Sequence, residues 1–143
     1  MKNSLYSGKI VYLSTYPPTE CGIATFTQDL TWAVAEHTAT APSIISVLQG
    51  NGNFSNPQEV ELTINKNRLK DYIKAALFAN QNADVVSVQH EYGIFGGEDG
   101  EMIIHFLEHL EKPVVVTLHT ILYEPTHKQK EILSKTGQYA DKV

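Results

Sequence analysis

Several features that assign a chain to a broad class are missing from these 143 residues. Only 11 lysines and arginines stand against 16 aspartates and glutamates, so the basic surplus of a nucleic-acid binder is absent. A single cysteine excludes an internal disulfide. No apolar run reaches membrane-spanning length, and the N-terminal "MKNSLYSGK" lacks the apolar centre of a signal peptide. Together these absences predict a cytoplasmic protein with no membrane span and no nucleic-acid partner.

What is present is the composition of a globular domain, with 42% hydrophobic and 19% charged residues. The length suits one domain spanning residues 1–143. Short β-branched runs predict strands at 9–14, 43–48, 60–64, 84–89 and 113–120. Apolar residues at helical spacing predict helices at 24–36, 67–81, 98–111 and 126–139.

The order of these elements predicts the fold class. Strands and helices alternate, and the strands are apolar on both faces, which is typical of a parallel sheet covered by helices on both sides. We therefore expect an α/β, Rossmann-like doubly wound fold with strand order 3-2-1-4-5. Residues 49–59 have the composition of a loop, and this link is short for a parallel crossover, so we expect an irregular corner there.

The helical periodicity also predicts which side chains face the sheet. For the first helix the predicted inward residues are Phe26, Leu30, Ala33 and Val34. For the second they are Leu69, Tyr72, Ile73, Ala76 and Leu77.

Three unusual segments are predicted to meet at one edge of this sheet. In open α/β sheets, ligands bind beyond the carboxyl ends of the strands, where the strand order reverses. At that point the first strand ends in "TYPPTECGIAT", the strand at 84–89 in "QHEYGIFGG", and the strand at 113–120 in "LHT". Their convergence predicts a ligand-binding crevice.

The first of these segments places Gly22 just before a predicted helix. The free N–H groups and the dipole of a helix start favour an anion such as a phosphate. The segment lacks the G-x-G-x-x-G dinucleotide fingerprint, and a glycine that only serves the turn is an equally good interpretation at this point.

The second segment holds four glycines, at positions 93, 96, 97 and 100. Glycine permits positive φ and close approach of backbone N–H groups to a phosphate or a sugar hydroxyl. A strained turn between strand and helix is the alternative, and such a turn seldom needs four glycines.

Two histidines, His90 and His119, end neighbouring strands and face the same crevice. A neutral imidazole can donate or accept a hydrogen bond beside a bound sugar or phosphate. A single histidine at a strand end is usually structural, but for two that converge a functional role is as good an interpretation as a structural one.

Two other patterns are weaker. "HFLEH" has the H-x-x-E-H spacing of zinc proteases, but His105, Glu108 and His109 lie off the apolar stripe of their helix, so we expect no metal site. Cys21 is placed near His90 and His119 and suggests a thiol enzyme, although Glu20 disfavours a thiolate.

Taken together, "YPPTECGIATFTQDL", "DVVSVQHEYGIFGGEDGE" and "PVVVTLHT" resemble the N-terminal half of bacterial family 4 glycosyltransferases, the retaining group of GT-B architecture. The resemblance runs from about residue 9 to residue 143. It implies an acceptor-side domain of an enzyme that moves a sugar from a nucleotide sugar to an acceptor. It also implies front-face transfer with retention and with neither a metal nor another cofactor.

The resemblance implies roles for individual residues. The backbone of Gly22 and Ile23 approaches the donor diphosphate, and His90 is the catalytic-site residue beside the transferred sugar. The acceptor or sugar side is formed by Glu91, Tyr92, Gly96, Gly97, His119 and Thr120.

In that family a second domain holds the nucleotide sugar, and its motifs are not found in this sequence. We therefore expect the 143-residue chain to fold but not to turn over a sugar nucleotide. We also expect the uncovered cleft face to favour homo-oligomers. Two alternatives remain open here: a stand-alone, non-catalytic Rossmann-like binding module, and a thiol enzyme that uses Cys21.

Overall fold

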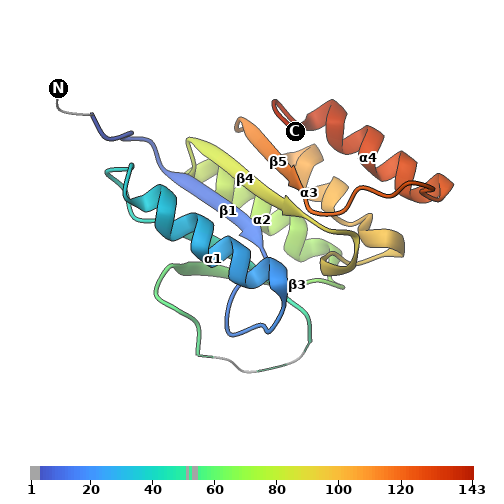
Figure 1. Cartoon of the computed structure of the whole chain (residues 1–143), viewed down its shortest axis with the longest axis horizontal. Coiled ribbons are helices and arrows are strands. Elements are labelled where there is room, and N and C mark those ends of the chain that lie inside the picture. The colour runs from blue at the N-terminus through green and yellow to red at the C-terminus, as the bar shows by residue number, and fades with distance from the viewer. Residues whose placement is uncertain (1–3, 51, 53–54) are drawn as a thin grey trace.

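The computed structural model describes residues 4–50, 52 and 55–143, and it contains a five-stranded parallel sheet (Figure 1). The strands are β1 (Ile10–Ser14), β2 (Ser43–Leu48), β3 (Val60–Asn65), β4 (Val85–His90) and β5 (Val114–Leu118). The helices are α1 (Gly22–Ala35), α2 (Leu69–Asn82), α3 (Ile103–His109) and α4 (His127–Tyr139), with 3₁₀ turns η1 (Tyr92–Ile94) and η2 (Glu98–Gly100). The strand order β3-β2-β1-β4-β5 confirms the predicted Rossmann-like fold.

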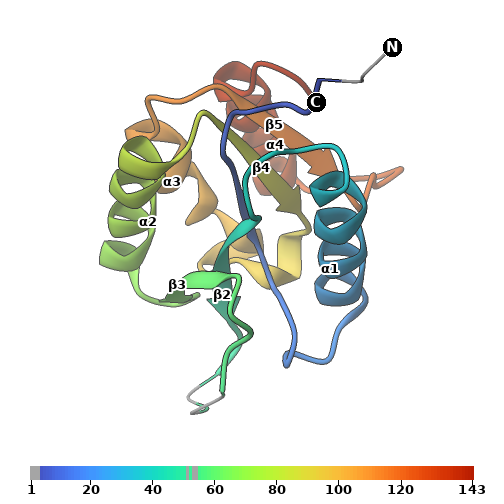
Figure 2. The same ribbon diagram turned by 90° about the vertical axis from the view of Figure 1, so that its left-hand side faces the viewer.

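Helices cover the two faces of the sheet unequally. Figure 2 shows α1 on one face and α2 with α3 on the other. The face towards α2 and α3 carries the larger apolar core, to which all five strands contribute buried valines, leucines or isoleucines. The α1 face has a smaller core of Tyr12, Tyr16 and Ile44. The strands are therefore apolar on both sides, as a parallel sheet requires.

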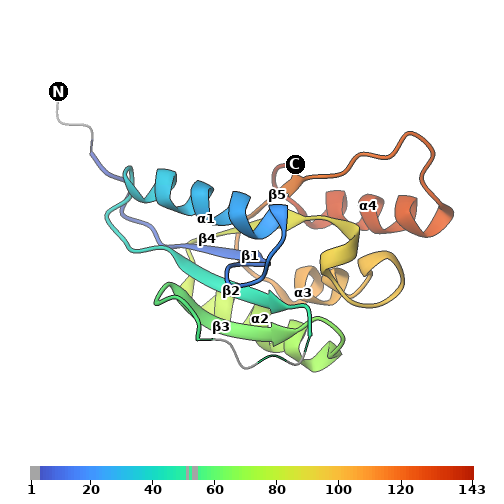
Figure 3. The ribbon, with the colours of Figure 1, turned by 60° about the horizontal axis from the view of Figure 1, so that its bottom comes forward.

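The link between β2 and β3 contains no helix in its described residues 49, 50, 52 and 55–59 (Figure 3). Residues 51, 53 and 54 of the predicted loop lie outside the described part. A return along a six-residue strand spans about 20 Å, and an extended link of this length reaches about 35 Å, so no helix is needed. The expected irregularity is present as a register shift between Ile44 and Ile45 in the β2–β3 pairing.

The predicted inward faces of the first two helices were partly wrong. In α1, Phe26 and Ala33 point to solvent, and the buried residues are Ala24, Thr27 and Thr31. The hydroxyl of Thr27 can be buried because it bonds to Ser14 Oγ (2.8 Å) and donates to the Ile23 carbonyl (2.7 Å).

Two of the α2 residues that are predicted to face inward, Leu69 and Leu77, are exposed, and each is more than 40% accessible. The helix buries Tyr72 and Ala76, as predicted, together with Ala75 and Ala79. The alanines are small, so they allow α2 to lie close to its neighbour α3. The face of α2 that is turned inward is therefore the one with small side chains and not the most hydrophobic one.

The helix predicted at 98–111 is shorter, because its first part is not helical. Gly97 and Gly100 have φ of 79° and 80°, and Asp99 has φ of 52°. These left-handed residues prevent a continuous helix, and α3 begins only at Ile103.

The chain after α4 returns to the edge of the sheet. Lys142 forms a parallel bridge with Val115, and the Val116 N–H donates to the Lys142 carbonyl (2.9 Å). Across residues 4–50, 52 and 55–143, no helix has both the length and the apolar character needed to cross a bilayer.

Candidate functional site

His90 ends β4 and is completely buried, with its ring edge-on to Tyr92 (5.2 Å between centroids) and tilted against Phe95 (5.9 Å). Burial, with a smaller contribution from His119, lowers the pKa of His90 to about 4. The imidazole is therefore neutral at pH 7, with one nitrogen that donates and one that accepts.

The hydrogen-bonding groups of this aromatic cluster are not used by the protein itself. Within the described part of the chain, His90 Nδ1, His90 Nε2 and the Tyr92 hydroxyl have no hydrogen-bond partner although all three atoms are buried. Most buried side-chain polar atoms in proteins have a partner, and an unpartnered one costs about 1–3 kcal/mol. Such unsatisfied polar atoms mark His90 and Tyr92 as candidates for binding another group.

His119 follows β5 and is linked to His90 through the backbone, because the His119 N–H donates to the His90 carbonyl (2.9 Å). The side-chain bond from His119 Nε2 to Gln89 Oε1 is 2.8 Å long, and Gln89 in turn donates to Ser87 Oγ (3.1 Å). Since a carbonyl oxygen only accepts, the proton lies on Nε2 and Nδ1 is the free acceptor. Burial lowers the pKa of His119, and the Glu91 carboxylate opposes this shift.

The start of α1 reaches the same edge of the sheet. The ring of Phe26 packs edge-on against His119 at 4.7 Å between centroids. Cys21 caps the helix, because its Sγ accepts a hydrogen bond from the Ala24 N–H (3.4 Å). The same Sγ is hydrogen-bonded to the Thr15 hydroxyl (3.2 Å). In the described residues Cys21 has no hydrogen bond to an imidazole, so the geometry offers no support for a thiol–imidazole pair.

Gly22 is the first residue of α1 and is exposed, and a Cβ placed on it would meet no atom within 4 Å. Packing within the chain therefore gives no reason for a glycine at this position. Ile23, next in the helix, is half-buried and packs against the larger core. Its side chain anchors the helix start. Since the Ala24 N–H donates to Cys21 Sγ, the N–H groups of Gly22 and Ile23 are the ones that can bind an anion.

The glycine-rich segment folds into two tight turns after β4. The Glu91 carboxylate accepts from the Gly93 N–H (2.7 Å) and caps η1. A Cβ on Gly96 would lie 1.8 Å from the Lys66 carbonyl oxygen, and one on Gly100 would lie 2.5 Å from the Tyr92 carbonyl oxygen. Close approach of backbone to backbone therefore requires glycine at both of these positions.

A pocket of about 290 Å³ lies between this segment and the corner that joins β3 to α2. It is lined by Lys66, Asn67, Tyr92, Gly93, Phe95, Gly96, Gly97, Asp99 and Gly100. Of the predicted residues, Tyr92, Gly96 and Gly97 line it, and Tyr92 joins it to His90. Gly22, Ile23, Glu91, His119 and Thr120 lie outside it; Thr120 follows His119 directly and is half-buried.

Lys66 is the functional candidate that the sequence did not reveal. Its ammonium donates to the Gly93 carbonyl (2.9 Å) and to Gln49 Oε1 (3.3 Å), and Gln49 donates to the Ile94 carbonyl (3.0 Å). None of the ion pairs of the described residues includes Lys66. Its position just after a strand places it on the carboxyl edge, and this was the available signal.

The H-x-x-E-H segment forms its own contacts on α3. His105 Nδ1 lies 3.5 Å from Glu108, and His109 Nδ1 bonds to the His105 carbonyl (2.8 Å). Among the residues that the structure describes, no group of three or more His, Cys, Asp or Glu side chains is arranged to hold a metal ion.

Comparison of the chain with family models, with curated proteins and with solved structures finds no significant match. The function is therefore argued from the site.

Proposed function

We propose that this chain is the acceptor-side domain of a cytoplasmic, retaining glycosyltransferase that moves a sugar from a nucleotide sugar to an acceptor. The observation that carries the proposal is His90, a buried, neutral histidine at the switch point of the sheet whose two ring nitrogens have no partner in the described residues. A neutral imidazole in such a place can bond to a sugar hydroxyl without placing a charge beside it.

In this proposal each of the predicted groups contacts the donor, the transferred sugar or the acceptor. The N–H groups at the start of α1, at Gly22 and Ile23, hold the donor diphosphate through hydrogen bonds and the helix dipole. His90 binds the transferred sugar, and His119 with Thr120 lies on the acceptor side. The pocket beside Tyr92, Gly96 and Gly97, with Glu91 at its margin, receives the acceptor.

Exposed apolar side chains at this edge support a covering domain. Ile121 and Tyr123 in the link after β5 are 80% and 98% exposed, and Phe26 at the start of α1 is 45% exposed. In the proposed enzyme a donor domain packs over this edge and supplies the remaining groups around the transition state. The same surface would favour self-association of the isolated chain.

The test is a transfer assay on two polypeptides: the 143-residue chain alone, and the chain joined to its donor domain. Release of nucleoside diphosphate from sugar nucleotides is expected only from the second. In that protein His90→Ala is expected to lower kcat/KM by about tenfold, the worth of one hydrogen bond. Expressed as a free energy, this loss of activity is expected to exceed the loss in the free energy of unfolding.

His37→Ala is the matched control, because His37 is exposed and follows α1 at the opposite end from Gly22. Donor-dependent transfer by the chain alone would show that no second domain is needed. If His90→Ala lost as much free energy of unfolding as it lost in kcat/KM, expressed as a free energy, His90 would be a structural residue. The stand-alone binding module would then be the better description of the chain.

A second prediction concerns Gly22. Because a Cβ at this position meets no atom, Gly22→Ala is expected to fold with a stability equal to the parent or higher by up to about 1 kcal/mol. In the complete enzyme Gly22→Val is expected to raise the KM for the donor about tenfold, because its methyl groups keep the diphosphate away from the helix start. Unchanged donor kinetics in a folded Gly22→Val enzyme would remove Gly22 from the donor site.

A further inference from the structure

A second hollow lies at the amino end of the sheet, away from the candidate site. It encloses about 380 Å³ and is lined by Trp32, Ala41, Pro42, Gln58, Glu59 and Glu61. Trp32 and Gly22 are ten residues apart in α1, so the groove is about 15 Å along the helix axis from the proposed donor site. Its volume is within the range of small-molecule sites.

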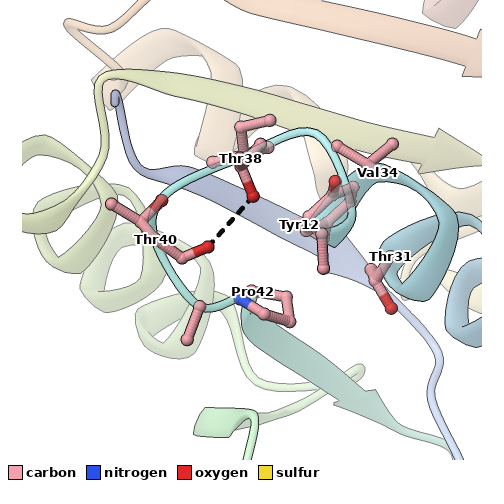
Figure 4. Close-up of a pocket in the computed structure, with 9 residues that line it drawn as sticks. Tyr12, Thr31, Val34, Thr38, Thr40 and Pro42 are labelled. Atoms are coloured by element: carbon pink, nitrogen blue, oxygen red, sulfur yellow. Dashed lines mark hydrogen bonds between the residues drawn. The ribbon is translucent and has the colours of Figure 1, made fainter. Parts of the chain in front are cut away.

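One wall of the groove is an exposed indole. The side chain is that of Trp32, the only tryptophan of the chain, and it is 55% accessible. Opposite surfaces come from the α1–β2 connection and from the residues that lead into β3. A separate void of about 10 Å³, lined by Pro42, Thr31 and Val34 among others, is too small for an organic ligand (Figure 4). A ligand would therefore lie in the groove itself, against the indole.

The charge of the groove is negative. Glu61 is neutralised, since it pairs with Lys9 Nζ (3.1 Å) and accepts from Ser43 Oγ (2.9 Å). The Glu59 carboxylate accepts a hydrogen bond from the Tyr16 hydroxyl (2.7 Å) and takes part in none of the ion pairs of the described residues. Among the residues that the structure describes, no lysine or arginine lines the groove. An uncompensated carboxylate thus faces a hollow that has an aromatic wall.

The bond from Tyr16 holds Glu59 in place. Burial, and to a lesser degree the Glu59 carboxylate, raises the pKa of Tyr16 to about 12. The phenol therefore stays protonated and continues to donate, so one carboxylate oxygen is fixed, while the other has no hydrogen-bond partner among the described residues.

We propose that this groove binds a small organic cation, an ammonium or guanidinium group carried on a short hydrocarbon. The charge lies near the free oxygen of Glu59, and the indole of Trp32 provides a cation–π contact and an apolar surface. The complementarity of charge favours a cation over a neutral sugar, which would use the indole but gain nothing from the unpaired charge. This inference does not depend on glycosyl transfer.

Trp32 allows a direct test, because the fluorescence of a single tryptophan reports on the groove alone. The chain is titrated at pH 7 with butylammonium, and in parallel with 1-butanol, butyrate, methyl glucoside and sodium chloride. We expect a saturable change of emission with butylammonium and none with the others. Saturation by butanol or by methyl glucoside with the same midpoint would overturn the proposal, and so would a response matched by salt.

The charge is tested with Glu59→Gln, whose amide oxygen still accepts from Tyr16, so the fold is expected to be retained. The midpoint for butylammonium is expected to rise about fivefold, as for loss of a partly exposed ion pair. Glu124→Gln is the matched control, because Glu124 is an exposed glutamate in the β5–α4 link. Equal midpoints for Glu59→Gln and the parent would refute the role of the carboxylate.

The indole is tested with Trp32→Ala by ligand-observed saturation-transfer NMR, which needs no tryptophan signal. Loss of the butylammonium signal in a variant with unchanged far-UV circular dichroism supports the proposal. An undiminished signal in that variant would place the cation elsewhere.

Discussion

Replacing Gly96 by alanine is expected to lower the free energy of unfolding by about 3 kcal/mol. The added Cβ would lie 1.8 Å from the carbonyl oxygen of Lys66 and 2.7 Å from its carbonyl carbon. Both are backbone atoms at the β3–α2 corner, and they cannot rotate away as a side chain can. The Gly96 N–H also donates to the Tyr72 hydroxyl (3.0 Å), which itself donates to the Lys66 carbonyl (2.8 Å), so relief of the clash would break these two bonds.

The measurement is urea unfolding followed by circular dichroism, with Gly137→Ala as the matched control. Gly137 lies inside α4, and a Cβ there meets no atom within 4 Å. That substitution is expected to stabilise the protein by up to about 1 kcal/mol, because alanine is the better helix former. The close approach at Gly96 would be refuted if Gly96→Ala were as stable as the parent.

Lowering the pH from 7 to 4 is expected to remove about 3 kcal/mol of stability through His90 alone. The pKa of His90 is about 4 in the folded protein, against 6.5 ordinarily. As the pH falls, the unfolded chain therefore binds the proton first. The contribution of the neutral, buried imidazole is complete above about pH 6.5 and is lost as the pH falls towards 4.

The pH effect is isolated by comparing the parent with His90→Phe, which cannot be protonated. Their difference in unfolding free energy is expected to change with pH between about 6.5 and 4 in favour of the variant. Carboxylates that also titrate in this interval cancel in the difference. A difference that stays constant over the interval would mean that the pKa of His90 is the same in the folded and unfolded states.

The sheet was predictable because its rules are general. Apolar strands that alternate with helices determine a parallel sheet and its strand order, and the two strand-end histidines are joined by a backbone hydrogen bond at one edge. The exposure of Phe26 was not predictable from periodicity, because its neighbour Thr27 is buried through specific hydrogen bonds. The role of Lys66 was hidden because its partners, the Gly93 carbonyl and Gln49, are distant in sequence.

The glycine-rich segment shows where sequence reasoning was incomplete. The sequence favours the approach of a ligand as the reason for its glycines, with a strained turn as the alternative, and Gly97 has the positive φ that such a turn uses. Gly96 and Gly100, however, are required by contacts with backbone atoms of the protein itself. One glycine cluster therefore both packs the turn against its neighbours and shapes the adjoining pocket, and composition alone does not separate these two tasks.

The unequal cover of the two sheet faces has a consequence for local unfolding. The buried residues of α1 are one alanine and two threonines, whereas those of α3 are two isoleucines, a phenylalanine and a leucine. Since apolar burial supplies most of the free energy that holds a helix in place, the amide hydrogens of α1 should exchange through a smaller opening than those of α3. The proposed phosphate site and the cation groove lie towards opposite ends of α1, so a ligand at either end would slow exchange along the whole helix.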